Sequence, residues 1–210
     1  MPIIILFAIL VSTYLMVMAK RVPSLLSNFR YQSFFIFLMI LMNGFSGKDI
    51  ELCFVAFLIL ALKVIVIPYF LYRTAKRINV DENLGLIINP QLSLVAALVI
   101  TYFSWTFSRN LTLNNGYSWM AATVSLAAVF IGGFLMISRL KAFTQVTGLL
   151  VMENGIFLLA SSISGGMPFF VEIAVFFDVF VSVIVMGLFV YRINKLFTHI
   201  DVNKLSELKG

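Results

Sequence analysis

Residues 54–68 read FVAFLILALKVIVIP, an apolar run whose single charged side chain, Lys63, lies near the centre. The run is part of a longer apolar stretch over residues 51–72. A helix needs about 20 mostly apolar residues to cross a hydrocarbon core of roughly 30 Å. Strands of a β-barrel would show short segments of alternating polarity instead. The stretch therefore predicts a transmembrane helix.

The composition extends this interpretation to the whole chain. Hydrophobic residues make up 61% of the 210 positions and charged residues 11%, whereas a soluble globular chain is about half apolar and a quarter charged. The formal net charge is +6, but the basic residues flank apolar runs, so we expect a lipid bilayer as partner and no nucleic acid. With one cysteine and one histidine, the chain lacks ligands for iron–sulfur clusters or bis-histidine haem. We expect no metal or cofactor in this chain.

The apolar runs are separated by charged or turn-rich breaks and predict an all-α, polytopic membrane helix bundle of about seven transmembrane helices. The predicted spans are 2–19, 31–46, 51–72, 91–108, 118–137, 145–162 and 169–191. The break at residues 20–30 contains Pro23 and Asn28. The first run has neither a basic n-region nor a small-residue cleavage site, so we expect a retained span and no signal peptide.

The distribution of basic residues predicts the orientation of the bundle. Twelve of the fifteen Lys and Arg residues follow odd-numbered spans, two (Lys48 and Arg109) follow even-numbered spans, and Lys63 lies within a span. Basic residues concentrate on the cytoplasmic side of membranes. We therefore expect the N-terminus outside and the C-terminus in the cytoplasm. No internal repeat is evident, which disfavours a transporter built from inverted halves.

Three ionisable residues lie at one predicted depth. Lys63 is near the middle of the third span, Glu153 is in the middle of the sixth, and Asp178 is about two residues from the centre of the seventh. Each charge at the bilayer centre costs about 3 kcal/mol on insertion scales, so such residues usually face the bundle interior and mark ion or proton routes. We predict that all three form a proton path. Glu172, about 120° around the helix from Asp178, is a further candidate nearer the outer end.

The same charges allow a structural alternative. Lys63 could pair with Glu153 or Asp178 only to neutralise the bundle, because buried pairs can fix packing without transporting anything. Pro68 removes the helix hydrogen bond to the carbonyl of Val64, which would either open a polar notch beside Lys63 or produce a plain kink.

Three further residues of the sixth span are candidates for helix contacts. Asn154 is either a helix-to-helix hydrogen bond or a member of the relay. Gly148 and Gly155 lie seven residues apart on one helix face. We expect these two glycines to allow close helix packing.

Five short strings lie in order along the chain: Lys63-Val64 before Pro68, Met152-Glu153-Asn154-Gly155, Val171-Glu172-Ile173, Val183-Ile184-Val185-Met186 and Asp201-Val202-Asn203. By their order and spacing the chain resembles component E of hydrogenase-4, a membrane subunit of formate-hydrogenlyase-type nickel–iron hydrogenases. The resemblance covers essentially the whole chain and is most specific over the last 60 residues.

The last three spans also resemble subunit K of respiratory complex I and the C component of Mrp-type antiporters, which are three-helix proteins with a glutamate in each of two helices. On this resemblance, residues 118–191 form a three-span subunit K-like region, where Glu153 and Asp178 take the places of the two glutamates. Residues 1–137 would form an N-terminal five-span region, whose first four spans are extra. Residues 192–210 would form a cytoplasmic tail.

The resemblance implies a non-catalytic, multi-pass subunit of a complex I-like membrane-bound hydrogenase in a prokaryotic inner membrane. Its partners would be antiporter-like membrane subunits, a membrane anchor similar to the H component of complex I, and a soluble hydrogenase arm that carries nickel–iron and iron–sulfur centres. The alternatives are a structural subunit that only links the antiporter-like and anchor subunits, and a subunit of a cation/proton antiporter.

Overall fold

The computed structural model describes residues 2–47, 50–77, 87–110, 116–139 and 142–163. Its elements are α1 (Pro2–Met18), α2 (Val22–Gly47), α3 (Ile50–Ile59), the π-helix η1 (Leu60–Val66), α4 (Ile67–Arg77), α5 (Pro90–Arg109), α6 (Gly116–Ile137) and α7 (Ala142–Ile163). The described ranges hold helices and no β-strand, so the predicted all-α class is confirmed. The first six predicted spans correspond to helices, whereas the seventh, 169–191, lies outside the described residues.

Several of the helices have the length and polarity of membrane spans. Four described segments are long and apolar enough to cross a membrane: Val22–Gly47, Leu52–Arg73, Pro90–Arg109 and Trp119–Ile137. Large apolar side chains are exposed on the outside of the bundle, with Phe7 at 66%, Phe54 at 70% and Phe103 at 66% exposure. In a bilayer these side chains would contact the acyl chains of lipids, because the hydrocarbon core contains no water. The chain is a polytopic membrane helix bundle.

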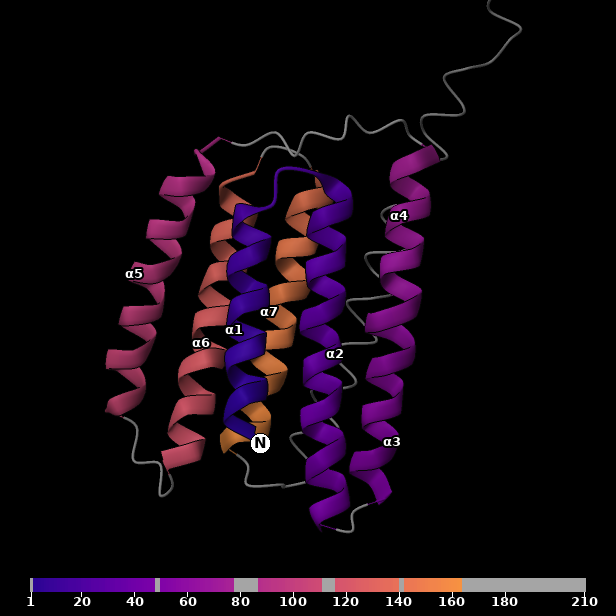
Figure 1. Cartoon of the computed structure of the whole chain (residues 1–210), viewed down its shortest axis with the longest axis vertical. Helices are drawn as coiled ribbons and strands as arrows, with labels where there is room; N and C mark the ends of the chain where they lie inside the picture. The colour runs from indigo at the N-terminus through magenta and orange to yellow at the C-terminus, as the bar shows by residue number, and fades with distance from the viewer. Residues whose placement is uncertain (1, 48–49, 78–86, 111–115, 140–141, 164–210) are drawn as a thin grey trace, which may run out of the picture.

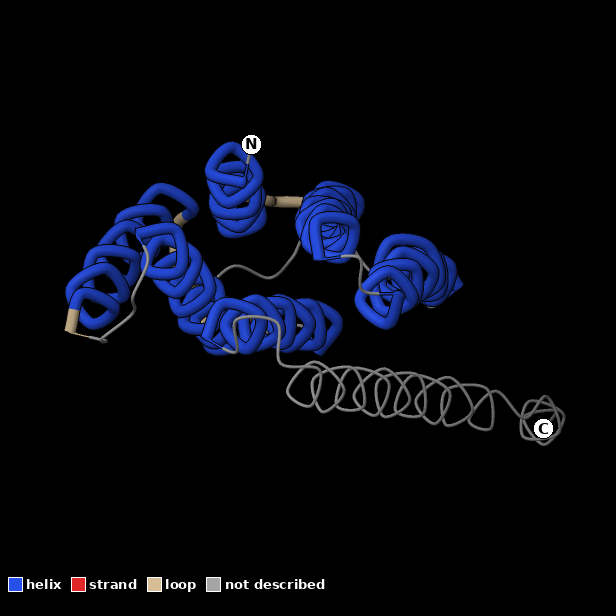
Figure 2. The backbone as a smooth tube through the Cα atoms, turned by 90° about the horizontal axis from the view of Figure 1, so that it is seen from below, coloured by secondary structure: helices blue, strands red, loops and turns tan. Residues whose placement is uncertain are grey.

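Successive helices run in alternating directions through the bundle, and Figure 2 views them nearly end-on. In Figure 1, α1, α4 and α6 end at the top, where α2, α5 and α7 begin. α1 packs on α2, α5 and α6, while α2 also packs on α7 and on the continuous helix formed by α3, η1 and α4. Among the described elements, α6 and α7 form the most extensive contact.

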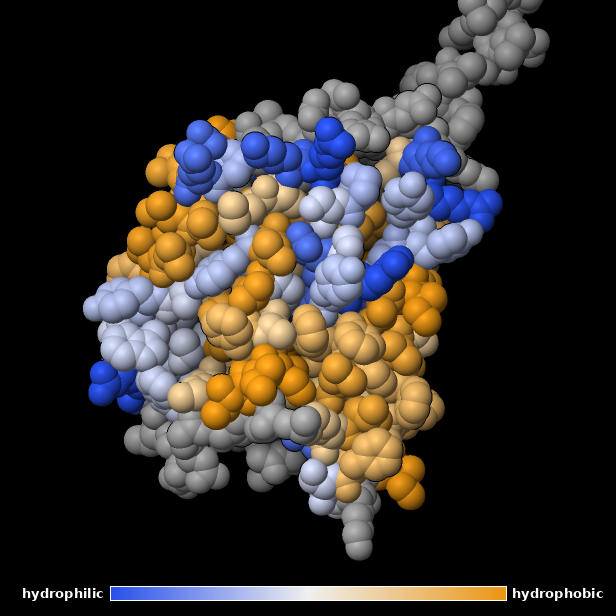
Figure 3. Space-filling model, viewed as in Figure 1, coloured by the Kyte–Doolittle hydropathy of each residue, from blue (hydrophilic) through white to orange (hydrophobic). Residues whose placement is uncertain are grey.

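The two ends of the bundle differ in chemistry. The end where α1 and α4 finish carries Lys20, Arg21, Arg73 and Lys76, and we call it the basic end; Figure 3 shows hydrophilic residues gathered there. At the opposite end, Trp105 and Trp119 pack with ring centroids 6.4 Å apart, and the Arg109 guanidinium lies 5.1 Å from the Trp105 ring centre. Indole rings favour membrane–water interfaces.

The predicted start of the second span is wrong by nine residues, because α2 begins at Val22 and not at residue 31. Pro23 lies in the first turn of the helix, where its missing N–H removes no intrahelical hydrogen bond. Asn28 lies within the helix. A proline in a polar segment predicts a break, but at this position it is compatible with helix initiation.

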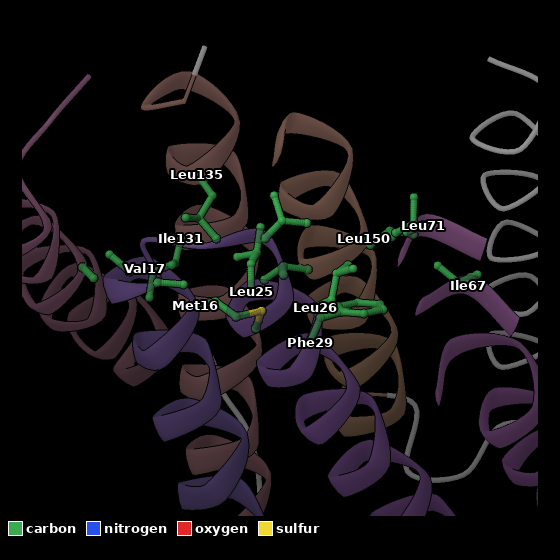
Figure 4. Close-up of a cluster of buried hydrophobic side chains, with 14 of the residues drawn as sticks. Met16, Val17, Leu25, Leu26, Phe29, Ile67, Leu71, Ile131, Leu135 and Leu150 are labelled. Atoms are coloured by element: carbon green, nitrogen blue, oxygen red, sulfur yellow. The ribbon is translucent and has the colours of Figure 1, made fainter. Parts of the chain in front are cut away.

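Two apolar clusters fill the bundle at different depths. The basic-end cluster, part of which Figure 4 shows, includes Met16, Val17, Leu25, Leu26, Phe29, Ile67, Leu71, Ile131, Leu135 and Leu150. The far cluster includes Leu6, Ile9, Ile36, Phe37, Ile40, Ile59, Ala121, Val124, Phe157 and Leu158. Each cluster draws side chains from α1, α2, α6, α7 and the third span, so both clusters hold these helices together.

Candidate functional site

A layer of buried polar side chains lies between the two apolar clusters. In four elements, buried polar residues lie in the sequence between a residue of one cluster and a residue of the other. On α1, Ser12 and Thr13 lie between Ile9 and Met16, and on α2, Gln32 and Ser33 lie between Phe29 and Ile36. Around η1, Lys63 lies between Ile59 and Ile67, and on α7, Glu153 and Asn154 lie between Val151 and Phe157. These seven polar residues are at most 4% exposed. We call them the polar layer.

Lys63 makes the central contacts of the polar layer. Its Nζ donates a hydrogen bond to Asn154 Oδ1 at 2.8 Å and lies 3.8 Å from Glu153 Oε2. The ammonium group thus faces a neutral acceptor and a carboxylate from consecutive residues of α7. This separation exceeds direct hydrogen-bond distance, so a proton would pass between the amine and the carboxyl group through one water or after a small shift of the side chains.

The Asn154 amide is held from its other side by α2. Its Nδ2 donates to Gln32 Oε1 at 3.0 Å and to Ser33 Oγ at 3.1 Å. An amide group has an acceptor end and a donor end, so these bonds turn the carbonyl oxygen of Asn154 toward Lys63. Gln32 and Ser33 therefore orient the group that holds the lysine.

The hydrogen-bond chain continues into α1. Gln32 Nε2 donates to Thr13 Oγ1 at 2.8 Å, and Thr13 Oγ1 donates to the Ile9 carbonyl at 2.8 Å. Every donor in the chain points away from Lys63, from Asn154 to Gln32 to Thr13. Because each of these groups is buried, loss of one partner would leave a polar atom with no hydrogen bond to replace those it makes with water in the unfolded chain, which costs free energy of folding.

Lys63 lies in the middle of the π-helix η1. The Ile67 N–H donates to the Leu62 carbonyl, five residues earlier, whereas an α-helix bonds four residues back. Pro68, which is buried, follows directly in the first turn of α4. π-Helical turns are rare and frequently occur at functional sites. The irregular turn therefore lies at Lys63, the single charged residue of the apolar run 54–68.

Glycines bring the backbones of α6 and α7 into close approach. A Cβ added at Gly148 would lie 2.8 Å from the Gly132 carbonyl oxygen, and one added at Gly155 would lie 2.7 Å from the Val129 backbone nitrogen. Any side chain at these two positions would force the helices apart. The glycines thus allow the backbone of α7 to pack directly on that of α6. Glu153 and Asn154, also on α7, are buried within the bundle.

Arg139, which the sequence pattern treats only as a membrane flank, is 2% exposed. Its guanidinium donates to the Val17 carbonyl at 2.8 Å and the Ala19 carbonyl at 3.0 Å, so it satisfies carbonyls at the C-terminus of α1. Burial lowers the pKa of Arg139 to about 10, which leaves the group charged at neutral pH. It locks α1 to the end of α6.

The structure brings together three of the residues singled out in the sequence, Lys63, Glu153 and Asn154. Asp178 and Glu172 lie outside the described residues. Sequence reasoning missed Thr13, Gln32 and Ser33, although each is a polar residue inside or beside an apolar run. Within the described ranges, no group of three or more His, Cys, Asp or Glu side chains could hold a metal ion.

Comparison with known proteins identifies relatives of the chain. It is 32% identical over 172 residues to the uncharacterized protein Rv0085 of Mycobacterium tuberculosis, an alignment that covers 80% of this chain and 78% of that protein. It is 29% identical over 151 residues to hydrogenase-4 component E of Escherichia coli and of Shigella flexneri, covering 70% of this chain and 69% of theirs. No family model and no solved structure matches the chain.

The second group of relatives confirms the resemblance to hydrogenase-4 component E. The likeness to subunit K of complex I and to the C component of Mrp-type antiporters stays a prediction. Taken with the membrane helix bundle, the identity and coverage of these alignments show that the chain belongs to the family of Rv0085 and hydrogenase-4 component E.

Proposed function

We propose that this chain is a non-catalytic membrane subunit of a hydrogenase-type oxidoreductase complex, and that its polar layer carries protons between neighbouring subunits. The relatives named hydrogenase-4 component E support the membership of such a complex. The observation that carries the proton role is the contact of Lys63 with both Glu153 and Asn154 inside a layer closed off by apolar residues.

The two apolar clusters set the direction of proton movement. Each cluster places packed aliphatic side chains between the polar layer and one end of the bundle, and such packing leaves few voids large enough for water. A proton on Glu153 therefore moves more readily within the layer, parallel to the membrane plane, than along the bundle axis. On this proposal Asp178 and Glu172 continue the layer beyond α7.

The members of the layer have different parts in this proposal. Lys63 and Glu153 gain and lose protons, whereas the amides of Asn154 and Gln32 have no titratable proton in the physiological range. The amides position the ammonium group within reach of the carboxylate. A change of charge in a neighbouring subunit would shift the Lys63 ammonium between Asn154 and Glu153, and thereby change the proton affinity of Glu153.

The arrangement of the complex is part of the same proposal. The chain would lie in a prokaryotic inner membrane with its N-terminus outside, between antiporter-like subunits and an anchor similar to the H component of complex I. Residues 118–191 would form the subunit K-like region, and residues 192–210 the cytoplasmic tail. Nickel–iron and iron–sulfur centres would belong to the partner arm.

The test is replacement of Glu153 in the complete complex, in inside-out membrane vesicles. Glu153→Gln should leave subunit assembly and electron transfer intact and reduce proton translocation per electron by about 100-fold, the lower end of the range expected for loss of a positioned acid–base group. Glu51→Gln, the same chemical change near the start of α3, is the matched control and should translocate normally. Glu153→Asp should restore part of the activity.

The structural alternative predicts a different result. If the ion pair only fixes packing, Glu153→Gln vesicles with an intact complex would translocate protons at the normal ratio. That outcome would remove the proton role and leave the chain as a link between neighbouring subunits. It would leave the membership of a hydrogenase-type complex untouched, because assembly is measured separately.

A further inference from the structure

A groove opens on the side of the bundle between α2 and α4, near the basic end. It has a volume of about 250 Å³ and is lined by Pro23, Leu26, Ser27, Arg30, Pro68 and Tyr72. Prolines lie on both walls, and both walls are apolar apart from three polar side chains. Figure 3 shows that hydrophilic side chains extend from the basic end into the apolar surface of the molecule.

Arg30 gives the groove its charge. α2 begins at Val22, so Arg30 lies eight residues, about 12 Å at 1.5 Å per residue, from the basic end of that helix. Its side chain is exposed, and within the part of the chain that the structure describes, no carboxylate lies within ion-pair distance of it. A guanidinium beside the acyl region is costly unless it reaches the interface or an anion.

The other polar groups of the groove fit an anion. Ser27 and Tyr72 are exposed in the lining, and each hydroxyl can donate one hydrogen bond. Arginine binds phosphate oxygens through two parallel N–H groups, which makes it the preferred residue for phosphate recognition. Leu26 and Pro68 supply an apolar floor of the kind that an acyl chain needs.

We propose that this groove binds an anionic phospholipid, with its phosphate on Arg30, Ser27 and Tyr72 and an acyl chain against Leu26 and Pro68. Basic pockets between membrane helices are suited to anionic headgroups, which lie at the level of the helix ends. Phosphate chemistry alone would also fit a free anion. The apolar floor beside the arginine favours a lipid, because a small hydrated anion gains nothing from it.

The experiment is native mass spectrometry of the full-length chain, in the complex with which it purifies, titrated with phosphatidylglycerol or phosphatidylcholine of matched acyl chains. The wild type should bind phosphatidylglycerol at least tenfold more tightly. Arg30→Gln should lose that preference. Arg73→Gln should keep it, because Arg73 lies at the same end on α4, contacts Tyr69 and does not line the groove.

The double variant Ser27→Ala/Tyr72→Phe provides an independent measurement if Arg30→Gln does not fold. It should weaken phosphatidylglycerol binding several-fold without affecting phosphatidylcholine. Equal affinity for the two lipids, or unchanged phosphatidylglycerol binding in Arg30→Gln, would overturn the proposal. So would displacement of the lipid by millimolar inorganic phosphate, which would indicate a free anion, or a cross-link from position 30 to an acidic side chain of another subunit.

Discussion

Gln32 joins two halves of the polar layer, because its oxygen accepts from Asn154 and its nitrogen donates to Thr13. Gln32→Leu conserves most of the side-chain volume but removes the hydrogen-bond partner that Gln32 provides to the buried Asn154 amide and to the buried Thr13 hydroxyl. We expect the free energy of unfolding in detergent to fall by about 1 to 2 kcal/mol, measured by denaturant titration. Gln91→Leu, the same change at an exposed position at the start of α5, should leave it nearly unchanged; an equal loss in both variants would contradict the role of Gln32.

At the residue scale, charge was a better guide than polarity. Lys63 and Glu153 could be predicted because an ionisable group in the middle of an apolar run has a large transfer cost. Thr13 and Ser33 could not, because hydroxyl groups in membrane helices can bond to carbonyls of their own helix, as Thr13 does with Ile9. Only the meeting of four helices distinguishes a member of the layer from a side chain satisfied locally.

The contact between α6 and α7 depends on glycine at particular positions. Gly155→Ala would place a Cβ 2.7 Å from the Val129 backbone nitrogen, so the helices must separate, at a cost of about 1 to 3 kcal/mol. Gly133→Ala, on α6, would meet only Met152 Sδ at 3.8 Å and should be neutral or stabilising by up to about 1 kcal/mol, because alanine favours helix. Denaturant titration of both variants tests this, and destabilisation of similar size at the two positions would refute it.

At the element scale, six helices could be predicted because apolar runs of this length have few alternatives in a membrane. The π-helix η1 could not, since its hydrogen-bond register depends on backbone geometry and has no counterpart in hydropathy. The start of α2 at Val22 was missed for a related reason. Proline ends a helix when it lies in the interior and begins one when it lies in the first turn, and hydropathy does not separate the two cases.

The part of the molecule that the structure describes combines an apolar outer surface, two apolar clusters and one polar layer between them. The layer draws residues from α1, α2, η1 and α7, so it exists only when the third and sixth predicted spans lie near the first two. This arrangement could not be predicted from the order of the spans. The chemistry of the two ends, by contrast, follows from the sequence, because consecutive helices alternate in direction and carry their basic residues to one end.

The basic end should therefore face the cytoplasm, as the distribution of Lys and Arg predicts. In a Cys53→Ser background, a cysteine introduced by Arg109→Cys should react with a membrane-impermeant maleimide in cells whose inner membrane is intact but whose outer envelope admits the reagent. A cysteine introduced by Lys76→Cys should react only after the membrane is permeabilised. Both positions are exposed and lie in the last turns of their helices, so labelling after permeabilisation is the internal control. The reverse pattern would invert the predicted topology and move the Arg30 groove to the outer leaflet.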